Sequence, residues 1–356
     1  MPQIQHLPPF GFRAVWEVLT TFSTGPWAIL TFLAELLAIG WYFGRVKALE
    51  NRGRRWPRRR MIAFVFGVLF LVIAWQTGVP IYAQSVFTVH VIQHVALMLA
   101  APICFAMSAP VTLVMQTMSR QNKTTLIRAL KSRPMRVLTN PVVAGVGNYG
   151  IMYWFFLDKG IVVSMAHPDL MDFVNICFLL FGSLVWWPVA SIDYIGRKRY
   201  PYAGRIGIAM VGMPLDSFLA IALLGGAARQ SIAPQMYSLA SVQTGAAVFW
   251  ILVGTFSMVG VVPATLQWMH QEERIGQRYD RLMDKVIGEK DGLDVESMSK
   301  GNLVVVGPDG RFMIVGSDSG IADMEDTETS PGAGLDMATG PGFNGATPII
   351  TPKADR

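Results

Sequence analysis

The chain has 356 residues, of which 52% are hydrophobic and only 15% are charged, and its mean hydropathy is +0.39. Soluble domains usually carry about 25% charged residues, so this composition excludes an ordinary soluble domain. The two cysteines, Cys104 and Cys177, lie inside apolar runs, which excludes a disulfide framework and a CxxC metal clip. The first twenty residues lack the pattern of a secretory signal.

Seven apolar segments dominate the chain after a mixed amino-terminal stretch. Within residues 1–26, Phe10 to Phe22 predicts a short interfacial helix with Trp16 at the level of the lipid headgroups. Each apolar segment is long enough to cross a hydrocarbon core of about 30 Å. We therefore predict an all-α membrane protein with a seven-transmembrane helix bundle over residues 27–268. The segments lie near 27–45, 61–79, 87–117, 141–157, 170–190, 205–225 and 241–266.

The loops between these segments alternate in charge. The intervening loops at 80–86, 158–169 and 226–240 contain only Lys159 and Arg229 as basic residues. Short cytoplasmic loops carry the excess of Lys and Arg, which places the amino terminus outside and the carboxyl terminus in the cytoplasm. The basic residues of the three basic loops are Arg45, Lys47, Arg52, Arg54, Arg55, Arg58, Arg59 and Arg60 in 45–60; Arg120, Lys123, Arg128, Lys131, Arg133 and Arg136 in 119–136; and Arg197, Lys198, Arg199 and Arg205 in 197–205.

Past the last apolar segment the chain changes character. Residues 269–316 predict a charged cytoplasmic helix over 271–290, then a hairpin of two strands around Pro308-Asp309-Gly310. Residues 317–356 are rich in Gly, Asp, Thr and Pro and predict a disordered tail. Because topology explains the basic loops, we expect no binding to nucleic acid.

Two histidines near the start of the third segment are the leading functional candidates. His90 and His94 are four residues apart, so a helix places them on one face, and Met98 continues that stripe. Imidazole inside a membrane segment is costly unless it is paired, ligated or hydrated, so its presence suggests function. The predicted topology brings the fifth segment to the same depth, where His167, Met171 and Asn175 form a second stripe.

These residue types suit a borderline or soft metal. Imidazole binds copper, zinc and iron, and thioether favours Cu(I), so His90, His94, His167 and Met171 form a candidate copper site. The alternatives are buried imidazoles hydrogen-bonded to backbone or water, and ligation of a b-type haem. Val91 stands where a zinc protease motif needs its general-base Glu, so hydrolysis is not expected and we predict no enzyme.

Other polar residues fall inside the apolar runs. Glu35 and Asp216 are intramembrane carboxyl groups, which are functional candidates by default. Met213 precedes Asp216 near the same depth, and Gln243 opens the seventh segment from the outer side. We group these four with Met98 and Asn175 as residues that support the metal site or are intramembrane polar positions.

Several motifs together resemble the integral-membrane CtaG family of bacterial cytochrome c oxidase assembly proteins. The resemblance covers roughly residues 25–268. It implies a multi-pass protein of the bacterial plasma membrane that works with cytochrome c oxidase subunits in the respiratory chain and handles copper at the outer face. The motifs are G-R-R-W-P-R-R-R at 53–60, H-V-I-Q-H at 90–94, A-A-P at 100–102, S-A-P-V-T-L at 108–113, N-P-V-V at 140–143 and W-W-P-V at 186–189, with Asp193 after it.

The chain also departs from the family pattern. Met171 and Asn175 stand where the fifth segment of the family usually carries two histidines, and Asp216 stands where the sixth often carries one. Ser241 replaces an acidic residue at the start of the seventh segment. The resemblance therefore implies a copper site with fewer ligands than usual. The alternatives are a metal-free accessory subunit of a respiratory complex and a haem-binding membrane redox subunit.

Overall fold

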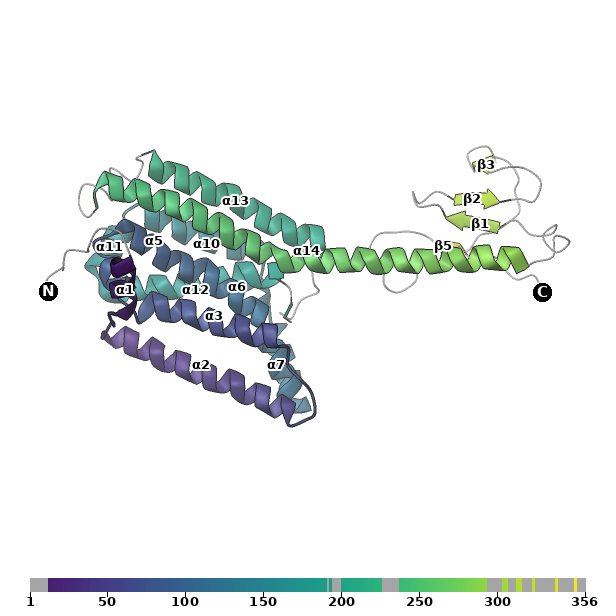
Figure 1. Cartoon of the computed structure of the whole chain (residues 1–356), viewed down its shortest axis with the longest axis horizontal. Coiled ribbons are helices and arrows are strands. Elements are labelled where there is room, and N and C mark those ends of the chain that lie inside the picture. Colours follow the sequence, from purple (N-terminus) through teal and green to yellow (C-terminus); the bar gives the residue numbers. More distant parts are fainter. Residues whose placement is uncertain are drawn as a thin grey trace. The chain divides into compact units, whose positions relative to one another are not determined.

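The computed structural model describes residues 12–190, 192–193, 200–225 and 237–292, together with five short strands between 303 and 350. The chain divides into two units, Met1–Arg274 and Ile275–Arg356. The first unit is a bundle of helices that run side by side (Figure 1). The helices are α1 (Phe12–Thr20), α2 (Pro26–Glu50), α3 (Arg58–Trp75), α4 (Val79–Tyr82), α5 (Phe87–Val95), the π-helix η1 (Ala96–Ala100), α6 (Ala101–Ser108), α7 (Pro110–Thr117), α8 (Arg120–Leu130), α9 (Arg133–Leu138), α10 (Pro141–Leu157), α11 (Gly160–Ala166), α12 (Pro168–Ala190), α13 (Tyr202–Leu224) and α14 (Leu239–Gly292).

Within the described residues, five helical stretches are long and apolar enough to cross a membrane. They correspond to five of the predicted segments, so a helical membrane protein is confirmed to this extent. Two further helices occupy the second and fourth predicted segments: α3 has 18 residues and begins with three arginines, and α10 has 17 residues. The five are Pro26–Glu50, Phe87–Thr117, Pro168–Ala190, Tyr202–Leu224 and Leu239–Met283.

The stretch Phe87–Thr117 is the central element of the bundle. In its most apolar window 67% of the residues are buried, compared with 17% for α2. It contacts α3 and α12 along much of its length, whereas α2 packs against α3 and α7 at one edge of the bundle (Figure 1). Polar side chains on Phe87–Thr117 are consequently screened from lipid by other helices.

This central stretch is interrupted at η1, and the sequence supplies the reason. Pro102 has no backbone N–H, and its ring would clash with the carbonyl of Met98, four residues earlier, in a regular α-helix. A π-turn over Ala96–Ala100 accommodates the mismatch. Gly182 of α12 packs directly against the Met98 carbonyl, and a Cβ at this position would overlap it. A second break follows at Ala109, whose φ of 52° is left-handed, between α6 and α7.

A polar network stabilises the end of the bundle that carries the basic loops. The Trp56 Nε1–H donates to the Tyr42 hydroxyl (2.9 Å), which donates to the carbonyl of Ser108 (3.0 Å). The buried carboxylate of Asp193 accepts from the backbone N–H of Val111 (2.8 Å) and of Thr112, and so caps α7. The motifs around residues 56, 110 and 193 therefore meet at one place.

Arg205 is buried, although the sequence placed it in a basic cytoplasmic loop. Its guanidinium donates to the carbonyls of Val189 (2.9 Å) and Ala190 (2.6 Å), the last residues of α12, and to Gln267 Oε1 (3.0 Å). A cation at a helix C-terminus is favourable because the last carbonyls carry partial negative charge. Arg205 thus joins α12 to α13 and α14. The other basic residues of that loop, Arg197, Lys198 and Arg199, lie outside the described residues.

The second unit contains the end of α14 and two small sheets. In the first sheet β1 (Leu303–Val306), β2 (Phe312–Val315) and β3 (Ala322–Asp323) lie in that order, with Leu303 opposite Val315 in the antiparallel β1–β2 pair. These two strands are where the sequence predicted a hairpin. The second sheet pairs β4 (Met337–Ala338) with β5 (Ile349–Ile350). The rest of the tail predicted to be disordered lies outside the described residues.

Candidate metal site

His90 and His94 lie on α5, immediately before η1, and both are buried. His90 is 1% exposed and His94 is 0% exposed, and their ring centroids are 4.7 Å apart. Gln93, between them, donates from Nε2 to the carbonyl of Ala74 (2.9 Å) and so fixes α5 against α3. The sequence prediction that the two imidazoles share one face inside the bundle agrees with this placement.

Hydrogen bonds set the orientation and the tautomer of His90. Its Nδ1 lies 3.2 Å from the carbonyl of Ala83 and 2.9 Å from the Tyr237 hydroxyl, which itself donates to Ala83. A carbonyl only accepts, and the single hydroxyl proton of Tyr237 is already used, so the proton resides on Nδ1 of His90. Its Nε2 therefore carries a free lone pair. Burial raises the pKa of the Tyr237 phenol, which keeps this hydroxyl protonated.

Among the described residues, His94 has no hydrogen-bond partner on either ring nitrogen. Its imidazole is enclosed by phenylalanine rings: the centroid distances are 4.5 Å to Phe155, 4.9 Å to Phe178 and 5.7 Å to Phe156. Phe155 belongs to α10 and Phe178 to α12, so three helices enclose the imidazole pair. With Nε2 of His90, three buried imidazole nitrogens have no partner in the part of the chain that the structure describes.

These orphaned nitrogens are the chemical argument for a ligand. A buried polar group without a partner costs about 1–3 kcal/mol, so three of them would be a substantial fraction of a protein's net stability. Each neutral imidazole has one lone-pair nitrogen and one N–H, so a metal ion would bind two of the three nitrogens, Nε2 of His90 and one nitrogen of His94, while the other His94 nitrogen carries the proton. Two nitrogens that bind one ion at about 2.0–2.1 Å lie within about 4 Å of each other, which rings separated by 4.7 Å can satisfy.

The other residues predicted to belong to the metal site differ in burial. Asn175 is 1% exposed, its Oδ1 has no partner, and it lies one turn before Phe178, which contacts His94. Met171 is half-buried and packs against the core, whereas His167 is exposed at the end of α11. Met98 is buried within η1. Within the described residues, no group of three or more His, Cys, Asp or Glu side chains is arranged to hold a metal ion.

The remaining predicted residues occupy separate positions. Glu35 is buried on α2 beside Gln76, and Asp216 is buried on α13 beside Tyr149 of α10. Met213 is half-buried on α13. Gln243 is exposed and donates to the carbonyl of Leu224 at the end of α13 (3.4 Å).

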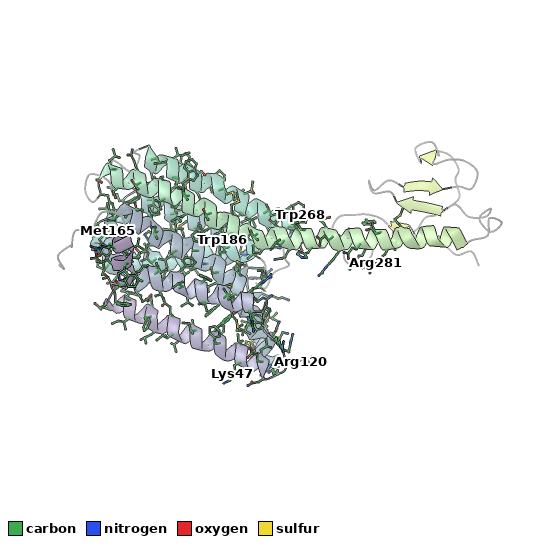
Figure 2. The ribbon with its side chains drawn as sticks, viewed as in Figure 1. Lys47, Arg120, Met165, Trp186, Trp268 and Arg281 are labelled. Atoms are coloured by element: carbon green, nitrogen blue, oxygen red, sulfur yellow. The ribbon has the colours of Figure 1, made fainter. Side chains whose placement is uncertain are left out.

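Sequence reasoning missed Tyr237, which contacts His90, and Met165, which contacts Tyr237. Tyr237 precedes α14, 147 positions after His90, so neither spacing nor periodicity indicates the contact. Met165 of α11 places its Sδ 3.8 Å from the Tyr237 hydroxyl. Figure 2 shows Met165 at the end of the bundle opposite Lys47 and Arg120. The sequence offered one indication: Met165 lies two residues before His167, in a loop predicted to face the outer side.

Comparison with known proteins gives this site its context. The model of a family described as cytochrome c oxidase caa3 assembly factor matches residues 40–271. This range contains three of the five transmembrane candidates in full, the second part of α2 and most of Leu239–Met283. The chain belongs to this assembly factor family. The matched range contains both imidazoles and the residues that orient them. No solved structure matches the chain.

Relatives of this family member occur in mycobacteria. A Mycobacterium bovis protein described as uncharacterized is 30% identical over 268 residues, which cover 70% of this chain and 40% of that protein. An uncharacterized protein of Mycobacterium leprae is 29% identical over 279 residues, covering 72% of this chain and 41% of that protein. The chain thus spans about 40% of the length of these curated relatives.

Proposed function

We propose that this family member handles copper for cytochrome c oxidase assembly, holding the ion transiently on His90 and His94 near the outer face of the plasma membrane. The observation that carries the proposal is the set of three buried imidazole nitrogens without hydrogen-bond partners. Membership in an oxidase assembly factor family supports the role in assembly. Oxidase subunits are the proposed recipients.

The proposed topology has seven spans, with α3 and α10 added to the five long apolar helices. Charge distribution supports it, because Lys47 and Arg120 lie at the end of the bundle opposite Met165 (Figure 2). Basic residues concentrate on the cytoplasmic side of membrane proteins. The Met165 end, which adjoins Tyr237 and through it His90, is then the outer end.

The side chains around the pair suit Cu(I) as cargo. The lone pair of His90 is directed by its bond network, and a second-sphere hydrogen bond of this kind orients an imidazole and raises its basicity. The phenylalanine rings exclude water and leave no room for a porphyrin beside His94, which disfavours the haem alternative. A site with only two imidazole ligands favours exchange of the ion over its permanent retention.

The test is copper stoichiometry in the purified protein. The wild type should bind about one Cu(I) per chain, and His90→Ala combined with His94→Ala should abolish binding. His270→Ala is the matched control, because His270 is exposed on α14 and bonds only within its own helix. Unchanged stoichiometry in the double variant would refute this site, and a Soret band would indicate haem.

A metal-free accessory role is the second candidate. It is favoured by one observation: His167, the expected third ligand, is exposed and is not grouped with the pair. The two roles differ in a deletion strain. The copper role predicts an oxidase deficient in copper that excess copper partly restores, whereas the accessory role predicts copper-replete oxidase in reduced amount.

A further inference from the structure

A mostly apolar cavity lies on another face of the bundle, between α10 and α13. The cavity has a volume of about 630 Å³, which is in the range of small-molecule sites. Its walls are the facing sides of α10 and α13, with Val185, Trp186 and Val189 of α12 and Ser257 of α14 also lining it. Neither the imidazole pair nor the phenylalanines around it line this cavity.

Glycines keep this cavity open. A Cβ built on Gly145 of α10 or on Gly207 of α13 meets no atom within 4 Å, so both residues face free space. Gly212 has a different role, since the Tyr149 hydroxyl occupies the place of its missing side chain. Val142, Val146 and Val211 line the cavity and are strongly exposed, so it opens sideways toward lipid.

One carboxyl group lies in the wall of this apolar space. Asp216 is a lining residue that is only 6% exposed, and Tyr149 engages its carboxyl group. Its Oδ1 has no hydrogen-bond partner among the described residues, but this atom is itself covered and does not face the cavity. Asp216 is the one carboxylic acid among the described lining residues. A mostly apolar cavity with a carboxyl group and a phenol together in its wall favours an occupant that brings a hydrogen-bonding group to them.

The position of Asp216 limits the chemistry of that occupant. It lies twelve residues after Gly204, where the cavity begins on α13, which corresponds to about 18 Å along the helix. A phospholipid headgroup at the membrane surface cannot reach this depth, and an acyl chain has no group to bond the carboxyl. The ligand must therefore be a lipid-soluble molecule that has a few polar atoms and enters the cavity from the bilayer.

We propose that this cavity binds a lipid-soluble quinone, with a ring oxygen at Asp216 and Tyr149 and the apolar tail leaving between α10 and α13. A flat ring suits a space bounded by Tyr149 and Trp186 and widened by glycines. A quinol hydroxyl donates to a carboxylate oxygen, and a quinone carbonyl accepts from a carboxyl or phenol proton. This site is independent of copper binding.

The experiment is titration of the full-length protein in lipid nanodiscs with a decyl-substituted benzoquinone, followed by tryptophan fluorescence. Quinones quench indole emission at short range, and Trp186 lines the cavity. The wild type should show saturable quenching, and Trp186→Phe should remove most of it. Trp250→Phe is the control, because Trp250 is exposed and does not line the cavity.

Two sets of variants separate the proposal from nonspecific partitioning. Gly145→Leu and Gly207→Leu each place their Cβ in free space and should weaken binding at least about tenfold by filling the cavity. Asp216→Leu should weaken it similarly through the lost hydrogen bond. Gly150→Leu, on the same helix as Gly145 and equally free of neighbours, should bind like the wild type. Absence of saturable quenching, or equal affinity in all these variants, would overturn the proposal and leave the glycine walls as a contact for a partner's transmembrane helix.

Discussion

The contact between Gly182 and the Met98 carbonyl predicts a large effect for a very small change. Gly182→Ala adds one methyl group on α12 at the point where η1 approaches most closely. The new Cβ would lie 3.0 Å from Met98 Cα and 2.7 Å from its carbonyl carbon, and closer still to the oxygen. These are backbone atoms, which cannot rotate away as a side chain can.

The magnitude follows from two opposing terms. Overpacking of a core costs about 1–3 kcal/mol. Because the neighbouring atoms here belong to the rigid backbone, we expect a cost of about 3 kcal/mol. The higher helix propensity of alanine returns about 1 kcal/mol. The net destabilisation is about 2 kcal/mol, which corresponds to a Tm lower by roughly 4–8 °C in a protein of this size class.

The assay is thermal unfolding of the purified protein in detergent, with Gly254→Ala as the matched control. Gly254 is exposed on α14 and a Cβ there meets nothing within 4 Å, so this variant should be as stable as the wild type or slightly more stable. If Gly182→Ala unfolded at the same temperature as Gly254→Ala, the close approach of α12 to η1 would not exist as described.

Two other substitutions test the networks at the two ends of the bundle. Tyr237→Phe removes the hydroxyl next to His90 Nδ1 and should weaken Cu(I) binding about tenfold in a chelator competition. Tyr279→Phe changes an exposed tyrosine and should leave the affinity unchanged. Equal affinities of the two variants would show that Tyr237 does not position His90. Asp193→Ala removes the cap of α7 and should lower the free energy of unfolding by about 1–2 kcal/mol, with Asp193→Asn less affected; an unchanged Tm for the alanine variant would contradict the cap.

Much of the bundle could be predicted because long apolar runs and caps are local properties. The segment around 141–157 coincides with α10, and that around 87–117 with the central stretch. The π-turn could not be predicted from Pro102 alone. Proline indicates an interruption of the helix, but not its form, and the close approach of Gly182 to the Met98 carbonyl is a contact between residues 84 positions apart.

Arg205 shows that counting basic residues in loops does not predict which of them are buried. A basic residue at the boundary of a predicted loop was assigned to the cytoplasmic surface, yet it is 1% exposed and bonds two carbonyls at the end of α12. Composition cannot distinguish an arginine that faces headgroups from one that caps a neighbouring helix. The contact requires α12, α13 and α14 to be assembled.

The candidate site was predictable in part. The i, i+4 spacing of His90 and His94 indicates a shared face whatever the fold. Their surroundings are non-local: Phe155 and Phe178 come from two other helices, and Tyr237 from the residues before α14. Depth matching alone favoured His167 as a third ligand, but depth does not determine whether a side chain at a helix end points inward.

Copper K-edge X-ray absorption of the Cu(I)-loaded protein tests the central claim most directly. We expect two imidazole nitrogens at about 2.0 Å, with their multiple-scattering signature, and loss of that signature when His90 and His94 are both replaced by alanine. Copper coordinated without imidazole, or an identical spectrum in the double variant, would contradict the account.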